Sequence, residues 1–335
     1  MSNPYSNKLV RYYPVQNPGR PNCVTNVQGW SWQIFYARLL PVNGPCQKLN
    51  NALCLLPIVW LCFDAFLVSV HGEVSPTRHP FPGIAIYSET RTNPPTRMFI
   101  AEIDLKNPRV RVQVSPGGPD PDGPGQWQTT LMRPTSIATR DGFDLVVNGD
   151  FFRARNIKDA EGVLAAFRSD VWSTVSGVAV SNGKTWSTTT TSRPCLVVET
   201  NHAVSIRTLS QPVPEASEIV SGNTILVADG KAAPHVNQQR HPRTAVGLDA
   251  KKSKLILLVV DGRKPGVAAG MNYDELAVEM IRLGCRDALN LDGGGSSVMA
   301  IRDTSKTGAF QILNEPTDGR ERAVANVLGI SVSAP

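Results

Sequence analysis

The residues best suited to chemistry lie in a glycine-rich stretch near the end of the chain. Asp292 follows a short apolar run, and the sequence from it reads D-G-G-G-S-S. Glycine reaches positive φ and lets other atoms approach the backbone, and successive N–H groups in such a turn form a concave anion site. Asp292 would stand at its mouth as an acid, a base or a metal ligand, although a plain turn inside a sheet is the alternative. The residues predicted to form the anion site are Gly293, Gly294, Gly295 and Ser296.

A second acidic residue ends an apolar run upstream. Residues 255–260 are six consecutive apolar residues, typical of a strand buried on both faces, and they lead into Asp261-Gly262-Arg263. A capping-box pattern then opens a predicted helix over residues 273–283, and residues 288–291 form the next apolar strand. This order of strand, helix and strand predicts two parallel strands joined by a right-handed crossover.

The predicted crossover would bring the two acidic residues together. Parallel strands end at the same edge of a sheet, and sites in open α/β sheets lie outside the carboxyl ends of their strands. Asp261 and Asp292 would then share a rim with Arg263 and the glycine turn. Two carboxylates side by side raise one pKa, and a nearby arginine lowers it again, so the sequence leaves open which carboxylate is the base or nucleophile.

Two further segments repeat the theme of a strand that adjoins polar residues. The apolar run 143–147 leads into Asn148-Gly149-Asp150, which makes a third element of the rim. Arg243 precedes the predicted strand 245–248, and an arginine beside an anion site can grip phosphate or carboxylate with two N–H groups. In other settings Asn148 would only cap a turn, and Arg243 would only be a surface charge.

The rest of the chain predicts a mixed α/β fold of the α+β kind. A mixed β-sheet core would hold the strand–helix–strand crossover, and few helices are expected beyond a short one at residues 135–140. Further apolar segments predict additional, antiparallel strands. These segments are residues 83–87, 98–104, 109–114, 176–181, 185–189, 195–199, 204–208, 225–228, 298–301 and 325–332.

Charge and cysteine usage exclude several classes of protein. The net charge is +6, but five basic residues against Asp64 alone lie in residues 1–72, so the body carries little excess charge and no nucleic-acid surface is predicted. The chain has no C-x-x-C spacing, no histidine pair at metal-ligand spacing and no nucleotide-binding glycine motif. We therefore predict neither a metal nor a cofactor. Cys195 and Cys285 would be either a disulfide or two buried thiols.

The chain divides into four predicted parts. Residues 1–47 show no sustained periodicity and are expected to be poorly ordered. Residues 48–72 contain the one long apolar stretch of the sequence and are predicted to be a signal peptide or a signal anchor. Residues 73–82 are rich in proline and read as a linker, and residues 83–335 are the predicted catalytic domain.

The apolar stretch supports three interpretations: a cleaved secretory signal, a retained anchor, or a core helix. Asp64 would cost about 2.5–3.5 kcal/mol at the centre of a bilayer, and Pro57 also weakens a permanent span. A signal or anchor is favoured over a core helix, and cleavage or retention is left open. Either form places the catalytic domain outside the cytoplasm, with membrane contact only through this segment if it is retained.

Taken together, the motifs resemble the phosphodiester glycosidase family, which includes bacterial domains similar to N-acetylglucosamine-1-phosphodiester α-N-acetylglucosaminidase. The resemblance covers roughly residues 80–333 and rests on the order and spacing of several motifs, since each motif alone is weak. The motifs are V-V-N-G-D-F-F (146–152), V-S-G (175–177), R-H-P-R-T-A-V-G-L-D (240–249), V-V-D-G-R (259–263), the helix at 273–283, A-L-N-L-D-G-G-G-S-S (288–297) and R-A-V-A-N-V-L-G-I (322–330).

The resemblance implies an extracytoplasmic hydrolase that cleaves the glycosidic C–O bond of a sugar-1-phosphodiester, such as one of N-acetylglucosamine. Its partner would be a carbohydrate phosphodiester or a cell-envelope glycan, and no cofactor is implied. Carried over motif by motif, the implied catalytic residues are Asp261, Asp292, Asn148 and Arg243. The implied substrate- or phosphate-binding residues are Asp150, Arg263, Gly293, Gly294, Gly295 and Ser296.

Two other classes of function compete with this hypothesis. A non-catalytic module that binds cell-envelope polysaccharide would favour aromatic platforms, whereas the body offers only Trp127, Trp172 and Trp186. A metal-dependent phosphodiesterase that cleaves the P–O bond would favour more histidines than the sequence contains. Two carboxylates and two arginines on one rim favour the glycosidase.

Overall fold

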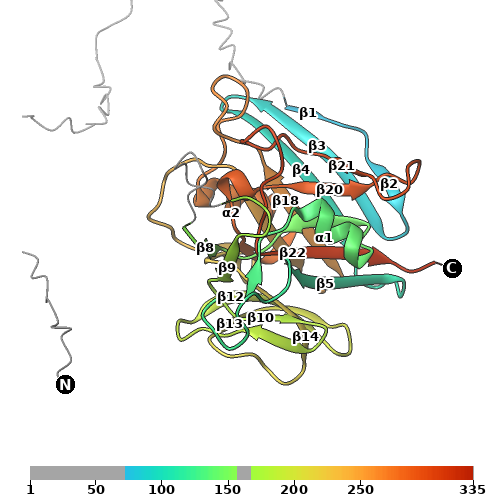
Figure 1. The fold of residues 1–335 in the computed structure, drawn as a ribbon. Helices are drawn as coiled ribbons and strands as arrows, with labels where there is room; N and C mark the ends of the chain where they lie inside the picture. The colour runs from blue at the N-terminus through green and yellow to red at the C-terminus, as the bar shows by residue number, and fades with distance from the viewer. Residues whose placement is uncertain (1–71, 157–166, 335) are drawn as a thin grey trace, which may run out of the picture. The chain divides into compact units, whose positions relative to one another are not determined.

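The computed structural model describes residues 72–156 and 167–334. The predicted N-terminal parts, residues 1–47 and 48–72, lie outside the described residues except for Gly72. Within the described residues, no helix is both long and apolar enough to cross a membrane. All the strand pairs described are antiparallel, and Figure 1 shows how the strands and two short α-helices are arranged.

The largest sheet has nine strands. Eight of them follow the order β1 (Gly72–Val74), β3 (Ile84–Thr92), β4 (Pro95–Asp104), β18 (Lys254–Val260), β17 (Arg243–Asp249), β19 (Cys285–Asn290), β15 (Thr224–Ala228) and β16 (Lys231–Ala232). The ninth, β2 (Arg78–Phe81), pairs with β3 beside this path. The central strands β17 and β18 are almost wholly buried, and for β18 the continuous apolar sequence predicts this.

Three smaller sheets complete the described fold. The second sheet runs β21 (Phe310–Ile312), β20 (Met299–Arg302), β7 (Leu145–Asn148), β22 (Asn326–Val332) and β5 (Val110–Pro116). The third runs β11 (Lys184–Ser187), β10 (Ala179–Ser181), β14 (Ala216–Ser221), β12 (Arg193–Glu199) and β13 (Val204–Leu209). A small sheet runs β6 (Thr129–Thr130), β9 (Trp172–Val175) and β8 (Phe152–Ala154).

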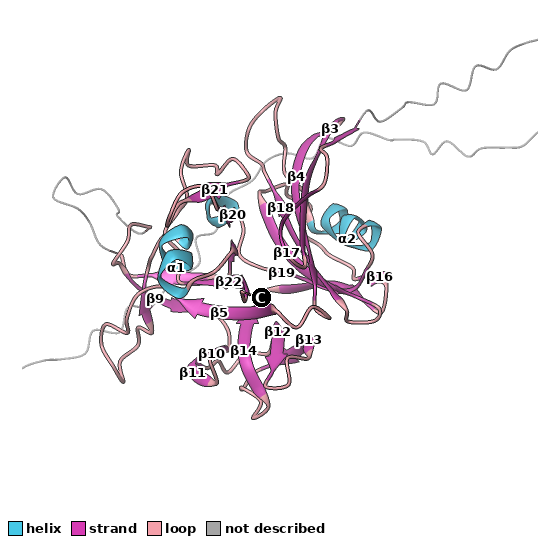
Figure 2. Cartoon of the chain, turned by 90° about the vertical axis from the view of Figure 1, so that its right-hand side faces the viewer, coloured by secondary structure: helices cyan, strands magenta, loops and turns pink. Residues whose placement is uncertain are grey.

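The main hydrophobic core lies where the three larger sheets meet. Side chains of β4 and β18 in the first sheet, of β7 and β22 in the second and of β12 in the third share one buried cluster. Helix α2 (Tyr273–Arg282) covers the opposite face of the first sheet, and α1 (Pro134–Asp141) covers the opposite face of the second (Figure 2). Both helices confirm sequence predictions, and α2 begins with the predicted capping box of Asn272 and Glu275.

The predicted parallel crossover is not confirmed. Strand β17 lies between β18 and β19 and pairs with both in antiparallel register, so the two strands joined by α2 are not neighbours. Sequence reasoning missed this insertion because the partner, residues 243–249, precedes both strands in the chain. The two strands still run in the same direction, because each is antiparallel to β17. The carboxyl ends of β18 and β19 therefore point toward one edge of the sheet.

The segment 73–82, expected to be a linker, contains two short strands. Both β1 and β2 pair with β3 at the edge of the first sheet. Proline is tolerated in edge strands because its missing N–H can face solvent, so a proline-rich segment can still extend a sheet. Cys195 and Cys285 are both buried free thiols, the second of the two predicted states.

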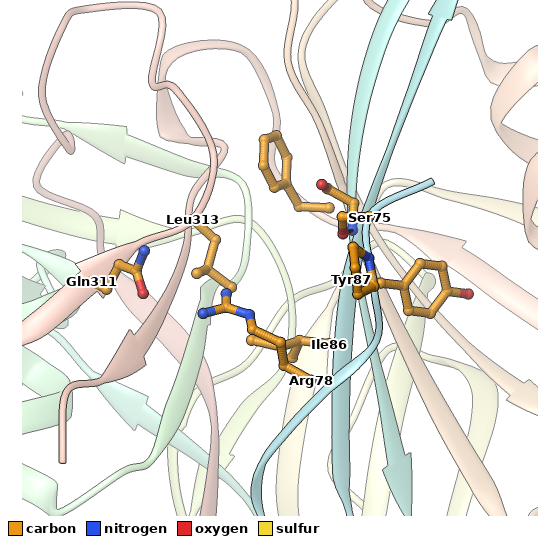
Figure 3. A pocket seen from close by; sticks show the side chains of 9 residues that line it. Ser75, Arg78, Ile86, Tyr87, Gln311 and Leu313 are labelled. Carbon is orange, nitrogen blue, oxygen red and sulfur yellow. Dashed lines mark hydrogen bonds between the residues drawn. The ribbon is translucent and has the colours of Figure 1, made fainter. Parts of the chain in front are cut away.

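A cavity of about 400 Å³ opens beside the edge of the first sheet, where β1 and β2 pair with β3. Arg78, Ile86 and Tyr87 line it on one side, and Gln311 and Leu313 line it on the other (Figure 3). The cavity lies between β3 and the strand β21 of the second sheet. It shares no residue with the site predicted from the sequence.

Candidate functional site

The backbone of Asp292 is fixed at the junction of the first two sheets. Asp292 lies two residues beyond the end of β19, and its N–H donates to the carbonyl of Gly149 at 3.0 Å. Its own carbonyl accepts a hydrogen bond from Nδ2 of Asn148 at 2.7 Å. The strand ends that carry Asn148 and Asp292 are therefore in direct contact, although they belong to different sheets.

Asn148 holds this junction together from a fully buried position. Its Oδ1 accepts hydrogen bonds from Oγ1 of Thr244 at 2.7 Å and from the N–H of Val298 at 3.2 Å. Its side chain thereby satisfies groups from β17, from the segment after the glycine turn and from Asp292 itself. Asn148 is 0% exposed, and its side chain holds the backbone of Asp292 in place.

Asp292 is partly exposed as a residue, and its carboxyl group has two close donors. Oδ1 accepts a hydrogen bond from the N–H of Gly293 at 2.8 Å, and the Ser296 hydroxyl is a second partner. Burial raises the pKa of Asp292 to about 6, while the two hydrogen bonds and the charge of Arg322 oppose that rise. A carboxyl group with this pKa is ionised at neutral pH and is still basic enough to accept a proton from water.

Asp150 is a second carboxyl group beside Asp292, and it is buried. Its Oδ2 accepts a hydrogen bond from Nδ2 of Asn326 at 2.6 Å, and its Oδ1 accepts one from the N–H of Ser221 at 3.1 Å. Burial raises the pKa of Asp150 to about 8, and the negative charge of Asp292 adds to the rise. Asp150 is therefore mostly protonated at neutral pH, which leaves Asp292 as the ionised member of the pair.

The backbone N–H groups of the glycine turn are largely engaged within the protein. Gly293 donates to the Asp292 carboxylate, Gly294 donates to the carbonyl of Pro242 at 2.9 Å, and Ser296 donates to the carbonyl of Gly293 at 3.2 Å. These three donors are therefore not available to the predicted anion site. The turn itself is closed by short-range hydrogen bonds into a 3-10 helix, Gly294–Ser296. An anion bound at this turn would need another source of positive charge.

Two arginines lie against the glycine turn and supply that charge. A Cβ atom on Gly294 would lie 3.2 Å from Nη2 of Arg263, and one on Gly295 would lie 2.0 Å from Nη2 of Arg322. A side chain at residue 295 would therefore displace the guanidinium group of Arg322 from its place against the turn. Gly294 also has φ +63°, a conformation that favours glycine. The close approach of two cations explains the glycines better than exposed N–H groups do.

Arg263 and Arg322 are held in place by different neighbours. Nη2 of Arg263 lies 3.4 Å from Nδ1 of His241, whose pKa is lowered by burial and by the neighbouring arginines, so the neutral ring can accept a hydrogen bond. Nη2 of Arg322 donates to Asp318 at 2.8 Å, and its guanidinium carbon lies 4.1 Å from the ring centre of Phe167. The two guanidinium groups thus flank the turn that follows Asp292.

Asp261 occupies a different place from the one expected of a partner to Asp292. It is 1% exposed, and its Oδ1 accepts hydrogen bonds from Nδ2 of Asn314 and from the N–H of Glu315, both at 3.1 Å. Burial raises the pKa of Asp261, while these bonds and the charge of Arg97 oppose the rise. Asn314 also donates to the carbonyl of Ser297 at 3.1 Å. The connection from Asp261 to the glycine turn runs through Asn314.

Arg243 points to the helix-covered face of the first sheet. Its Nε donates to the carbonyl of Met271 and its Nη2 donates to the carbonyl of Gln239, each at 2.9 Å. The guanidinium carbon lies 4.2 Å from the ring centre of Tyr273, and the residue is 4% exposed. Side chains alternate along a strand, so Arg243 faces α2 while Thr244 faces Asn148. Arg243 therefore holds the backbone at Gln239 and Met271, on the face of the sheet opposite to Asn148.

Sequence reasoning overlooked Arg322, Asn326 and Asn314. Arg322 and Asn326 both lie in the motif R-A-V-A-N-V-L-G-I, and Asn326 begins β22 just as Asn148 ends β7. A polar residue at the boundary of a buried strand was the available signal for Asn326. Arg322 gives no such signal, because its contact with Gly295 joins segments distant in the chain. Within the described ranges, no group of three or more His, Cys, Asp or Glu residues is arranged to hold a metal ion.

Comparison with solved structures shows a likeness in fold to another protein. The zebrafish N-acetylglucosamine-1-phosphodiester α-N-acetylglucosaminidase catalytic domain, auto-inhibited by its pro-peptide, aligns with a TM-score of 0.52 at 20% identity. That alignment covers 78% of this chain and 88% of the zebrafish chain. A hypothetical protein from Synechocystis aligns with a TM-score of 0.49 at 14% identity, over 77% of this chain and 64% of that one.

The sequence itself also matches known proteins. It is 36% identical over 92 residues to the SPbeta prophage-derived uncharacterized protein YomE of Bacillus subtilis (strain 168). That match spans 28% of this chain and only 13% of the length of YomE. The family model described as phosphodiester glycosidase matches residues 141–331, which is more than half of the chain and includes Asn148, Asp292 and Arg322. The chain therefore belongs to the phosphodiester glycosidase family.

Proposed function

We propose that the protein hydrolyses the glycosidic C–O bond of a sugar-1-phosphodiester and that Asp292 is its catalytic carboxylate. The observation that carries this proposal is the placement of a partly exposed aspartate, with a pKa of about 6, beside a turn flanked by Arg263 and Arg322. The carboxylate would accept a proton from the attacking water or would itself attack C1. The two guanidinium groups would hold the phosphate.

The chemistry of the leaving group suits this set of residues. Cleavage of the C1–O bond releases a phosphate monoester, which is already a weak base and needs little help from a general acid. What it needs is stabilisation of the negative charge that develops as the bond breaks. Arg263 and Arg322 are permanently charged and can bind phosphate oxygens in pairs. The family assignment supports a hydrolase, and this geometry supports the particular bond.

Asp150 and Asp261 take supporting roles in this proposal. Asp150 is 2% exposed and mostly protonated, so it sets the electrostatic environment of Asp292 without being an additional charge. Asp261 is 1% exposed and orders the segment around Asn314. Since both of these residues are buried and Asp292 is partly exposed, Asp292 is the one most open to water or to C1.

Hydrolysis in water enriched in ¹⁸O tests which bond breaks. The substrate would be N-acetylglucosamine-1-phosphate esterified to a simple alcohol, and the products would be examined by mass spectrometry. Cleavage of the C–O bond places the label on the sugar and leaves the phosphate monoester unlabelled. Label in the phosphate would show P–O cleavage and would overturn the proposal.

The pH dependence of kcat/KM should report the ionisation of Asp292. The raised pKa means that the carboxylate is lost as the pH falls through about 6, so we expect a plateau above this pH and roughly a tenfold decrease per unit below it. The phosphodiester does not titrate in this range. Arg322→Gln removes a charge that lowers the pKa, so it should move the acid limb to higher pH. A profile that stays flat down to pH 4.5 would contradict the role of Asp292.

A further inference from the structure

A second basic feature adjoins the glycine turn, and apart from Arg322 its residues are not used in the reaction proposed above. It is a cavity of about 730 Å³ lined by four arginines, Arg133, Arg168, Arg320 and Arg322. Asp318 and Glu321 also line it, so the arginines exceed the acidic residues by two. A phosphate monoester with a second charged group could be accommodated in a volume of this size.

The two acidic residues of the cavity are already bound to other groups of the protein. Asp318 accepts hydrogen bonds from Arg322 at 2.8 and 3.1 Å. Glu321 accepts a hydrogen bond from the N–H of Thr135 at 3.1 Å and another from its hydroxyl group, at the first turn of α1. The positive end of the helix further offsets the charge of Glu321. Arg133 and Arg320 are exposed, and their charges remain available to a ligand in the cavity.

Arg322 connects this cavity to the site of bond cleavage. It lines the cavity, and its guanidinium group also lies against Gly295 and lowers the pKa of Asp292. In the proposed reaction Arg322 binds the phosphate of the leaving group. The part of the substrate beyond that phosphate would then extend from Arg322 toward Arg133 and Arg320.

We infer that the cavity selects leaving groups that carry a further anionic group beyond the diester phosphate. This inference rests on the proposed function and narrows its substrate class to sugar-1-phosphodiesters with a negatively charged aglycone. Arg133 and Arg320 bind the distal anion, and Arg322 is shared with the diester. A neutral aglycone would leave these two charges unused and would gain nothing from the cavity.

Two substrates with the same sugar test the inference. One carries ethanol as its aglycone, and the other carries glycerol 3-phosphate. For the wild-type protein we expect kcat/KM to be about tenfold higher for the charged substrate, mostly through KM. Arg133→Gln and Arg320→Gln should each lower kcat/KM for the charged substrate by roughly fivefold and leave the neutral substrate unchanged. Equal rates for both substrates in the wild-type protein would overturn the inference.

A matched control separates a local effect from a general loss of positive charge. Arg286 is also exposed and is paired with Asp229 at 2.8 Å, at the end of β19 remote from the turn. Arg286→Gln should leave kcat/KM unchanged for both substrates. If it lowered the rate for the charged substrate as much as Arg320→Gln, the selectivity would come from net charge, and the assignment of this cavity would be wrong.

Binding measurements keep the inference testable if neither substrate is hydrolysed. Glycerol 1,3-bisphosphate and glycerol 3-phosphate would be titrated calorimetrically against the wild-type protein, Arg133→Gln and Arg320→Gln. Tighter binding of the bisphosphate, lost in both variants, would support the cavity as an anion site even though the hydrolase proposal had failed. Equal binding of the two compounds, or no binding, would reject the cavity whatever the fate of the hydrolase proposal.

Discussion

Replacing Asp292 with asparagine should lower hydrolysis of a sugar-1-phosphodiester by about 10³-fold or more while leaving the fold intact. The amide cannot accept a proton from water or attack C1. It keeps an oxygen that can accept the hydrogen bond now made by the N–H of Gly293 at 2.8 Å, so the turn should close as before. Initial rates of sugar release and the thermal unfolding midpoint, measured on the same sample, would show both effects.

Asp287 offers the matched control for this substitution. It lies in β19, the same strand that leads to Asp292, and accepts a hydrogen bond from the N–H of Asp229 at 3.1 Å, away from the turn. Asp287→Asn should retain nearly full activity. Wild-type rates for Asp292→Asn would remove Asp292 from the mechanism. If Asp292→Asn and Asp287→Asn were both folded and both inactive, the loss of activity would come from general disturbance of the strand.

Adding a single methyl group at Gly295 should lower kcat/KM by about a hundredfold. The new Cβ would lie 2.0 Å from Nη2 and 2.3 Å from Cζ of Arg322, so the guanidinium group must move away. Displacing a catalytic contact by about 1 Å can cost this much, because the charge no longer meets the phosphate. Steady-state kinetics of Gly295→Ala would measure the loss, which should appear with little change in the unfolding midpoint.

A double substitution shows whether the methyl group acts through Arg322. Arg322→Ala removes the group that the new Cβ would strike, so Gly295→Ala in that background should cause little additional loss. The two effects would then be strongly non-additive. Fully additive effects would mean that Gly295→Ala disturbs something other than Arg322 and would contradict the explanation for the glycine.

Local patterns were enough to place most elements in the sequence. The capping box at Asn272 and the apolar run at residues 255–260 predicted α2 and β18 almost to the residue, since both patterns reflect interactions between near neighbours in the chain. The direction of β18 and β19 was also predicted. Which strand lies between them was not, because the pairing with β17 depends on the whole sheet.

The side chains of the site were harder to predict than its backbone. Asn148 and Asp292 were predicted to lie on one rim, and their contact at 2.7 Å joins two sheets that the sequence does not distinguish. The glycine turn was recognised, but its N–H groups donate to the Asp292 carboxylate and to the carbonyls of Pro242 and Gly293, and glycine alone does not specify these acceptors. Arg322 could not be found, because its contact with the turn depends on the loop before β22.

The fully buried side-chain amide of Asn148 links the two sheets that carry the candidate site. This amide is hydrogen-bonded to Thr244 in the first sheet and to Asp292 just beyond it, while the backbone of Asn148 belongs to the second sheet. Neither layer by itself can orient the carboxylate, so no fragment that contains just one of them can be active. In the proposed mechanism activity therefore requires the two layers to be docked together, so hydrolysis would report on the complete tertiary structure.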